Sequence, residues 1–395
     1  MSLRIGFLIS HPIQYYTPIF RELSGLCDLT VFFAHHQTAE QQARAGFGVA
    51  FDWDIDLVSG YRSKFLDNIS PQPSTDRFSG CDTPGIAREI AEGGFDAFIV
   101  PGWGFRSYMQ AVKACRRARV PVFVRGDSQL VGPRNMLLRI AKAIAFSRLL
   151  RRFDGFLYVG QRSREYLLHY GAPANRMFFS PHCVDNASFH AGSDLARQSM
   201  DGGPRRSKRF LFVGKLLERK RPLDILKAAV LLREKKPVEV AFAGSGELES
   251  ELKEFARVSG VPAIFHGFVN QSEMPAVYAA ADVMVLPSDG LETWGLAVNE
   301  AMACGLPAVV SDAVGCGPDL VEQGVTGAVF PVAQISLLAA AMEAAISLDL
   351  TVVRQHLAAR MQIYSPLGAA KGIMEAAAVL EAGAPPKGEK RQLYA

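Results

Sequence analysis

Two glutamates on either side of a predicted helix start are the residues best placed to do chemistry. Glu292 precedes Gly295, where the apolar spacing becomes helical after the apolar run 282–286, and Glu300 lies inside the helix. The loop 288–294 before the helix presents free backbone N–H groups, which favour phosphate. At about 1.5 Å per helical residue the carboxylates lie roughly 12 Å apart.

That separation suits a ligand with a diphosphate between two hydroxyl-rich sugars. Each carboxylate can accept hydrogen bonds from one sugar, while the helix start holds the phosphates. A solvated helix that carries two acidic residues would show the same spacing, so the spacing alone leaves both readings open.

The elements that must position these groups alternate along the whole chain. Short apolar runs, each followed by a helical pattern, predict parallel strands, and 395 residues exceed one single-core domain. The fold class is therefore α/β, with two doubly wound Rossmann-like domains. The main runs are 3–9, 29–33, 96–100, 120–124, 155–159, 210–214, 238–243, 282–286, 309–315 and 324–330.

Composition excludes several classes of function. Lys and Arg number 43 against 39 Asp and Glu, so the charge gives no case for a nucleic-acid partner. Six cysteines without a CxxC pair suit a reducing compartment rather than a disulfide framework or a zinc ribbon. No apolar run has the length of a signal peptide core or a membrane span, which predicts a cytoplasmic chain.

Candidate binding residues follow the strands of the first half, where open α/β sheets bind ligands. His11 and Gln14 follow the first strand, Trp103 lies between two glycines, and Arg125 and Asp127 follow the run 120–124. The alternatives are a turn-capping His11 and a buried ion pair of Arg125 with Asp127. A GxGxxG turn is absent after the first strand, which argues against a dinucleotide-dependent oxidoreductase.

Two other segments carry charged residues in patterns typical of transferase sites. Lys215 and Lys220 follow the run 210–214, and ordinary surface cations are the alternative reading. Residues 52–56 contain a D-x-D pattern typical of metal-dependent transferases, but their alternation of acidic and apolar residues favours a half-exposed strand.

Glu292, seven residues, Glu300 and then Ala-Met-Ala-Cys-Gly-Leu-Pro resemble the E-x7-E signature of the family 4 glycosyltransferases. That family has the GT-B fold, in which two Rossmann-like domains face a cleft. The resemblance implies that Glu292 lies by the donor sugar, that Glu300 binds the ribose, and that Lys215 and Lys220 bind the diphosphate.

The strand ends and the resemblance together give a full set of site residues. The catalytic candidates are Glu292, Asp127 and Lys220. The donor-binding candidates are Lys215, Lys220, Gly244, Gly246, Phe268, Thr293, Trp294, Gly295, Leu296 and Glu300. The acceptor-binding candidates are His11, Gln14, Trp103 and Arg125, and no metal ligand is expected.

This sequence departs from the family pattern at several positions. Lys215 replaces an Arg, which keeps the charge but loses the bidentate fork. Asp127 stands where many members have a His, Trp294 replaces a Phe, and His182-Cys183 replaces Asn-Gly. The Gly-Gly pair of the first loop is missing.

The domain organisation follows from the same comparison. Residues 1–185 are expected to bind the acceptor and 209–365 the nucleotide sugar, with a polar linker at 186–208. Residues 366–382 are expected to form a helix that returns to the first domain, and 383–395 a loose tail.

The implied function is transfer of a sugar, with retention, from a UDP- or GDP-sugar to a glycan or lipid-linked acceptor in cell-surface polysaccharide or lipopolysaccharide synthesis. No cofactor or metal is expected. The alternatives are a GT-B epimerase or phosphorylase-type enzyme and a two-lobed sugar-binding protein.

Residues 134–153 carry six Lys or Arg and no acidic residue, with apolar residues at helical spacing. This pattern predicts a helix that contacts the anionic inner face of a membrane. The alternative is a core helix of the first domain with a solvated basic face.

Overall fold

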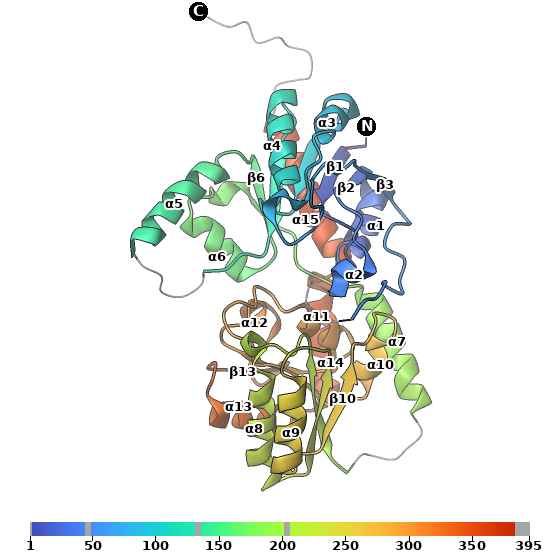
Figure 1. Cartoon of the computed structure of the whole chain (residues 1–395), viewed down its shortest axis with the longest axis vertical. Coiled ribbons are helices and arrows are strands. Elements are labelled where there is room, and N and C mark those ends of the chain that lie inside the picture. The colour runs from blue at the N-terminus through green and yellow to red at the C-terminus, as the bar shows by residue number, and fades with distance from the viewer. Residues whose placement is uncertain (1, 44–48, 131–135, 201–205, 384–395) are drawn as a thin grey trace, which may run out of the picture.

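The computed structural model describes residues 2–43, 49–130, 136–200 and 206–383, and the side chains of 136–139 and 380–383 lie outside its description. Two α/β domains lie one above the other (Figure 1). The first sheet has the order β3-β2-β1-β4-β5-β6-β7 and the second the order β10-β9-β8-β11-β12-β13. All strand pairs in both sheets are parallel, which confirms two doubly wound Rossmann-like domains.

Of the strands that the structure describes, ten agree with the apolar runs of the sequence, whereas Arg62–Phe65, Met177–Phe179 and Ala263–Gly267 lie outside those runs. In the first sheet they are β1 (Arg4–Ile9), β2 (Asp28–Phe33), β3 (Arg62–Phe65), β4 (Ala97–Val100), β5 (Val122–Gly126), β6 (Gly155–Tyr158) and β7 (Met177–Phe179). In the second they are β8 (Lys208–Val213), β9 (Val238–Ala243), β10 (Ala263–Gly267), β11 (Val283–Leu286), β12 (Ala308–Ser311) and β13 (Gly327–Phe330).

Helices cover both faces of each sheet. Those of the first half are α1 (Thr17–Leu26), α2 (Ala39–Gln42), α3 (Ile86–Gly93), α4 (Arg106–Ala118), α5 (Met136–Leu150) and α6 (Gln161–His169). Those that follow are α7 (Asn186–Ser199), α8 (Pro222–Arg233), α9 (Glu249–Ser259), α10 (Met274–Ala279), α11 (Leu296–Ala303), α12 (Gly317–Leu320), α13 (Ile335–Ala345), α14 (Leu350–Ile363) and α15 (Pro366–Gly383).

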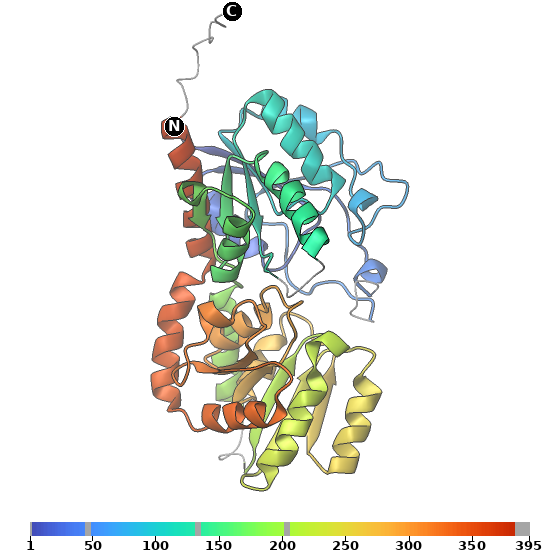
Figure 2. The same cartoon turned by 90° about the vertical axis from the view of Figure 1, so that its left-hand side faces the viewer.

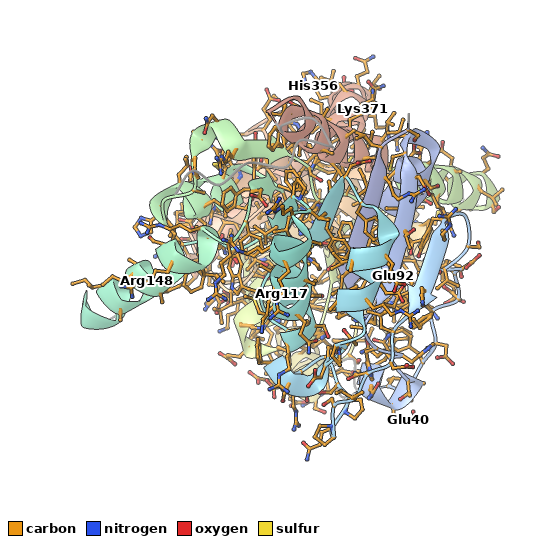
Figure 3. All side chains as sticks on the ribbon, turned by 90° about the horizontal axis from the view of Figure 1, so that it is seen from above. Glu40, Glu92, Arg117, Arg148, His356 and Lys371 are labelled. Atoms are coloured by element: carbon orange, nitrogen blue, oxygen red, sulfur yellow. The ribbon has the colours of Figure 1, made fainter. Side chains whose placement is uncertain are left out.

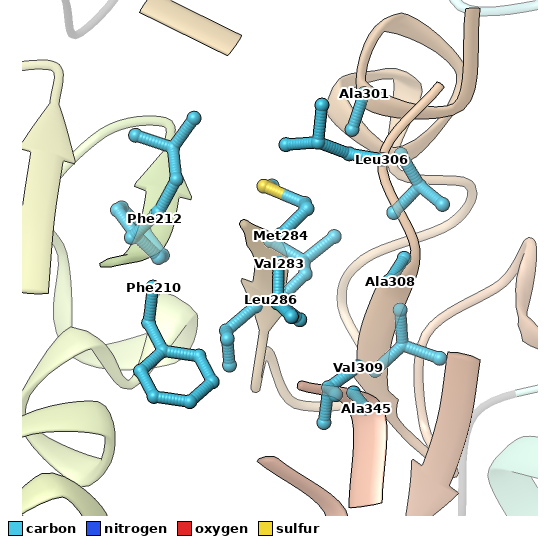
Figure 4. Packing of buried hydrophobic residues seen from close by; sticks show 14 of the residues in the cluster. Phe210, Phe212, Val283, Met284, Leu286, Ala301, Leu306, Ala308, Val309 and Ala345 are labelled. Atoms are coloured by element: carbon cyan, nitrogen blue, oxygen red, sulfur yellow. The ribbon is translucent and has the colours of Figure 1, made fainter. Parts of the chain in front are cut away.

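The core of the second domain forms because its central strands are apolar at every position. Phe210 of β8, Val283 and Leu286 of β11, and Val309 of β12 are buried side by side (Figure 4). A strand with helices on both faces has no solvent side, so the sequence shows continuous apolar runs instead of alternation. Each such side chain contributes about 1.5–3 kcal/mol relative to an exposed one. This core fixes the strand ends from which the site loops leave.

The last helix, α15, belongs to the core of the first domain. It packs against α1 and β7, and Ala369, Ala370 and Ile373 are buried there. Figure 2 shows α14 and α15 following each other along one side of the molecule, α14 beside the second domain and α15 beside the first. The chain therefore crosses twice between the domains, once before α7 and once before α15.

The expected linker 186–208 is largely a helix. Residues Asn186–Ser199 form α7, which packs against α10 and α11 of the second domain through buried Phe189. Asp185 caps this helix, because its side chain accepts a hydrogen bond of 3.0 Å from the backbone N–H of Ser188. The sequence did not predict this helix, because the polar composition outweighed the cap and Phe189, the large apolar residue that the helix buries. Residues 201–205 of the expected linker, and 384–395 of the expected tail, lie outside the described residues.

Two smaller differences concern the edge of the first domain. Residues 52–56 form a loop, not the expected half-exposed strand, and Asp54 instead accepts hydrogen bonds from Ser272 of the second domain. The sequence did not predict the edge strand β3, because its four residues include two cations and form no apolar run. In the structure these residues alternate between exposed and half-buried. Among the described helices, none is by itself long and apolar enough to cross a membrane; only Ile335–Ala345 with Leu350–Val379, bent by 100°, meets that criterion as a pair.

Candidate active site

A cavity of about 330 Å³ lies at the carboxyl ends of the strands of the second sheet and is closed on one side by the first domain. It brings together nine of the predicted site residues: Gln14, Lys215, Lys220, Gly244, Phe268, Glu292, Gly295, Leu296 and Glu300. Gln14 belongs to the first domain and the other eight to the second. The cavity therefore lies between the domains, and we refer to it below as the cleft.

Three cations form one wall of the cleft. Lys215 follows β8, and Arg219 and Lys220 lie in the short 3-10 turn Glu218–Lys220. Burial, together with the charges of Arg219 and Lys220, lowers the pKa of Lys215 below its ordinary value. Cations that repel one another in this way favour binding of a multiply charged anion. The sequence did not predict Arg219 as a site residue, because the family resemblance concerns only Lys215 and Lys220 in this segment.

Glu292 is paired within the cleft. Its Oε2 contacts Lys220 Nζ and accepts a hydrogen bond of 3.1 Å from Ser288 Oγ. Both side chains of the ion pair are largely buried, at 13% and 12% exposure for Lys220 and Glu292. A partly buried carboxylate needs such partners, because an unpaired charge away from water is costly.

Two glycines let the backbone approach the centre of the cleft. Gly295, directly before α11, has φ 104°, and Gly244, directly after β9, has φ 137°. Both values favour glycine. A Cβ on Gly244 would lie 2.0 Å from the carbonyl oxygen of Gly214, so no other residue fits there. Gly246 packs against the backbone of Leu216, next to the residues that line the cleft, and its donor contact stays a prediction.

Glu300 is the second carboxylate that lines the cleft. Its Oε2 accepts a hydrogen bond of 2.7 Å from the hydroxyl of Tyr278. Burial raises the pKa of Glu300 to about 7, although hydrogen bonds from Tyr278 and Gln271 oppose the rise. The carboxyl is thus poised near neutrality, which is common in functional sites. Tyr278 and Gln271 were not predicted, because nothing in the local sequence shows that their helix and loop face Glu300.

Asp127 reaches the second domain from the end of β5. Its Oδ2 accepts a hydrogen bond of 2.7 Å from Thr293 Oγ1 and lies 3.7 Å from His182 Nε2. Burial alone would raise the pKa of Asp127, but His182 and Thr293 together lower it to about 2. Asp127 is therefore a carboxylate at neutral pH and cannot act there as a proton donor. Neither Asp127 nor Thr293 lines the cleft as the structure defines it.

Trp294 was predicted to bind the donor but is buried between the domains, at 4% exposure. Its indole N–H donates a hydrogen bond of 2.7 Å to Asn299 Oδ1, and its ring faces His182 at 5.6 Å between centroids. A Cβ on Gly160 would come within 2.3 Å of this ring. The side chain of Trp294 therefore holds the loop before α11 against the first domain, and the donor contact of this residue stays a prediction.

The other predicted residues of the first domain are scattered. Arg125 is completely buried, with its guanidinium donating to Ser180 Oγ (3.1 Å) and to the carbonyl oxygen of Pro181 (2.7 Å). It has no exposed atom that could contact an acceptor, so that prediction was wrong. Trp103 packs edge-on against Phe146 of α5.

His11 lies beside the cleft, not in it. It lines a neighbouring cavity of about 250 Å³, which shares Trp53 with the cleft. Burial and the nearby His35 lower the pKa of His11 to about 4, so the ring is neutral at pH 7. Its Nδ1 is 3.0 Å from Ser10 Oγ, a contact between side chains, so the turn-capping and binding roles of His11 both stay predictions.

All six cysteines are buried and free. Within the part of the chain that the structure describes, no three or more His, Cys, Asp or Glu side chains are grouped so that they could hold a metal ion.

Comparison with known proteins locates the similarity. Residues 201–364 match the family model described as Glycosyl transferases group 1. A sulfoquinovosyl transferase of Arabidopsis thaliana is 35% identical over 153 residues, which are 37% of this chain and 28% of that protein. A D-inositol 3-phosphate glycosyltransferase of Arthrobacter sp. (strain FB24) is 32% identical over 170 residues, 41% of this chain and 40% of that protein. The match thus spans less than half the length of these curated relatives.

Solved structures match over nearly the whole chain. Anabaena HepE in complex with UDP and glucose has a TM-score of 0.66 at 16% identity, covering 96% of this chain and 100% of that one. A glycosyltransferase from Rickettsia africae ESF-5 has a TM-score of 0.69 at 12% identity, covering 96% and 99%. The second domain is therefore similar in sequence to group 1 glycosyl transferases, and the chain as a whole has the two-domain GT-B fold.

Proposed function

We propose that this protein is a glycosyltransferase that takes a sugar from a nucleoside diphosphate sugar bound in the cleft. The observation that carries the proposal is the set of charges that line the cleft. Three cations, Lys215, Arg219 and Lys220, share it with the carboxylates of Glu292 and Glu300. Glu292 pairs with Lys220, whereas Glu300 accepts a hydrogen bond from the hydroxyl of Tyr278. These charges suit a donor with the sugar at Glu292, the diphosphate at the cations and the ribose at Glu300.

The similarity of the second domain to glycosyltransferases supports this placement of the donor, since that domain supplies most of the residues that line the cleft. The complex of Anabaena HepE with UDP and glucose supports a uridine nucleotide as the first donor to test. A GDP-sugar is the second candidate. We extend the proposal to family 4 and to retention of configuration on the E-x7-E spacing of Glu292 and Glu300.

The residues of the cleft would act mainly by stabilising negative charge that develops during the reaction. When the bond between sugar and diphosphate breaks, the leaving diphosphate gains negative charge, which Lys215, Arg219 and Lys220 stabilise. In the protein as described, Lys220 pairs with Glu292. A bound diphosphate would compete for Lys220 and free the Glu292 carboxylate to accept hydrogen bonds from the donor sugar. Protein cations would thus supply the charge that a metal ion supplies in other transferases.

We place the acceptor on the side of the first domain, where Gln14 and Trp53 reach the cleft and His11 lines the adjoining cavity. A glycan or lipid-linked acceptor fits because α5 offers a surface for a membrane. Ile140 and Ile144 of α5 are 51% and 48% exposed. We therefore propose a cytoplasmic enzyme in cell-surface glycan synthesis, in peripheral contact with the inner face of the membrane.

The test combines binding and turnover. A panel of nucleoside diphosphates and their sugars is scored by thermal shift, where a ligand at about 100 times its dissociation constant adds about 2.7 kcal/mol. Donors that bind are then incubated with candidate acceptors, with and without a chelator. Release of the nucleotide only when an acceptor is present supports a transferase. Interconversion of donor sugars, or phosphate-dependent release, would instead support an epimerase or a phosphorylase-type enzyme.

A further inference from the structure

Gln129 of the first domain holds the loop that carries Glu292. Its side-chain amide donates hydrogen bonds to the backbone carbonyl oxygens of Gly290 (2.9 Å) and Glu292 (3.1 Å). It also lies 3.5 Å from the carbonyl oxygen of Ala313, in the loop after β12. One amide group of the first domain therefore binds two neighbouring loops of the second.

Arg162 completes this contact. Its Nη1 donates to Gln129 Oε1 and to the carbonyl oxygen of Ala313, both at 3.1 Å, and its Nη2 contacts the carbonyl oxygen of Asp312. Arg162 lies in α6 and thus fixes Gln129 from a separate element of the first domain. Both sides of the Gln129 amide are occupied, and the guanidinium fork leaves little freedom in their orientation.

The second domain supports the same loop from the other side. The backbone N–H of Gly315 donates to the carbonyl oxygen of Glu292 at 3.0 Å, so this oxygen accepts from both domains. One residue further, Thr293 Oγ1 donates to Asp127 Oδ2. The backbone around Glu292 is thus fixed at consecutive residues, while its carboxylate remains in the cleft.

Burial makes the contact specific to the arrangement in which the two domains touch. Gln129 is only 5% exposed. A buried amide without partners costs free energy, whereas a fully paired one contributes to stability and selects one geometry. The hydrogen bonds of Gln129 to the second domain exist only while the domains are together.

We propose that Gln129, supported by Arg162, is a positioning residue that couples contact between the domains to the placement of Glu292. The inference rests on the proposed function for its kinetic consequence, but not for its structural one. The cations and Glu300 belong to the second domain, so binding of a nucleoside diphosphate does not depend on Gln129. Transfer does, because it needs the Glu292 carboxylate in a fixed position.

The experiment compares wild type with Gln129→Met, which keeps the shape and removes the amide. Hydrogen–deuterium exchange of the ligand-free full chain is expected to rise at least about tenfold in residues 288–295, because opening of the loop becomes easier. The kcat is expected to fall about ten- to hundredfold, since small displacements of a catalytic group have effects of this size. The dissociation constant of UDP is expected to change less than about threefold, because its partners stay in place.

Asp54→Ala is the matched control. Asp54 accepts from the backbone N–H of Ser272 at 3.1 Å, so this variant also removes a contact between the domains, but one away from the Glu292 loop. It should leave exchange in 288–295 unchanged. An equal rise of exchange in 288–295 in both variants would show a general effect of domain contact and overturn the assignment to Gln129.

Unchanged exchange and unchanged kcat in Gln129→Met would also overturn it. If that variant does not fold, Arg162→Met tests the same network, and normal exchange in 288–295 together with normal kcat there counts against the proposal. If UDP does not bind to wild type, the proposed donor fails, while the exchange measurement still decides whether Gln129 holds the loop.

Discussion

At the scale of single residues, the ion pair of Lys220 with Glu292 is the feature most directly linked to turnover. Lys220→Ala removes a cation from the diphosphate wall, and Glu292→Ala removes the carboxylate by the donor sugar. Each is expected to lower kcat by at least about a hundredfold, because removing one group that stabilises developing charge costs about this much. Initial rates with saturating donor are the measurement.

The control is Lys235→Ala, which breaks an exposed ion pair with Glu343. Pairs of that kind contribute about 0–1 kcal/mol to stability and lie outside the cleft. Near-normal turnover of either cleft variant would show that the donor site has been assigned wrongly.

Glu300 gives a second prediction at this scale, since burial raises its pKa to about 7 from an ordinary value of 4.5. Ribose hydroxyls donate to the charged carboxylate, so UDP should bind more tightly as the pH rises from 6 to 8. Stability changes in the opposite direction. The folded protein holds the proton more tightly than the unfolded chain, so the contribution of Glu300 is greatest at low pH and is lost as the pH rises towards 7.

Titration calorimetry with UDP and urea unfolding between pH 5 and 8 measure both effects. Glu300→Gln removes the titrating group and keeps the shape, so both pH dependences should flatten relative to wild type. A wild-type affinity that does not change between pH 6 and 8 would contradict a role for Glu300 in ribose binding.

At the scale of elements, the sequence predicted the parts that follow from local pattern. The strand β11, the start of α11 at Gly295 and the lysines after β8 are visible because apolar runs, glycines and charges are close together in the chain. The sequence did not show which residues far apart in the chain come into contact on folding. Gln129 meets Glu292 across 163 positions of sequence, and the cover over Arg125 comes from residues 180 and 181.

The helix α5 shows the same limit in a form that can be tested. Its Phe146 packs against Trp103 and Tyr170, as expected of a core helix, while Ile140 and Ile144 remain exposed on another side. Arg148 lies at the periphery of the first domain (Figure 3), and Arg151 and Arg152 after the helix are also exposed. Residues 134 and 135 lie outside the described residues. The packing of Phe146 thus supports a core helix on one face, and membrane contact through the exposed side chains stays a prediction.

The prediction for α5 is salt-sensitive binding to vesicles that contain anionic lipid. Replacing Arg148, Arg151 and Arg152 with Glu should weaken it strongly, because each cation near such a surface contributes about 1 kcal/mol. The measurement is cosedimentation at low and high salt. The Debye screening length falls to about 3 Å at 1 M salt, so an electrostatic attraction to the vesicle is largely lost there.

The control makes the same charge change on the second domain by replacing exposed Lys235, Lys253 and Arg257 with Glu. Equal binding of wild type and the α5 variant at low salt would leave this helix with a structural role only.

At the scale of the whole molecule, the two chain crossings are tied together. The side-chain amide of Asn186, at the first crossing, donates to the carbonyl oxygens of Met361 (2.7 Å) and Tyr364 (3.0 Å), which precede the second crossing. Beyond it, α15 packs so closely on β7 that a Cβ on Gly372 would lie 1.8 Å from the carbonyl oxygen of Phe179. The return of α15 therefore ties the end of the chain to the first domain.

Gly372→Ala tests this arrangement through opposing effects. Alanine favours a helix over glycine by about 0.5–1 kcal/mol, but overpacking against a backbone carbonyl costs about 1–3 kcal/mol. The clash should dominate, so the midpoint of urea unfolding is expected to fall. Gly25→Ala in α1 is the matched control, because a Cβ there meets nothing within 4 Å and only the helix preference remains. That variant should be more stable than wild type. Stabilisation of both variants would mean that α15 does not rest on β7 in solution, and that the first domain does not depend on the end of the chain.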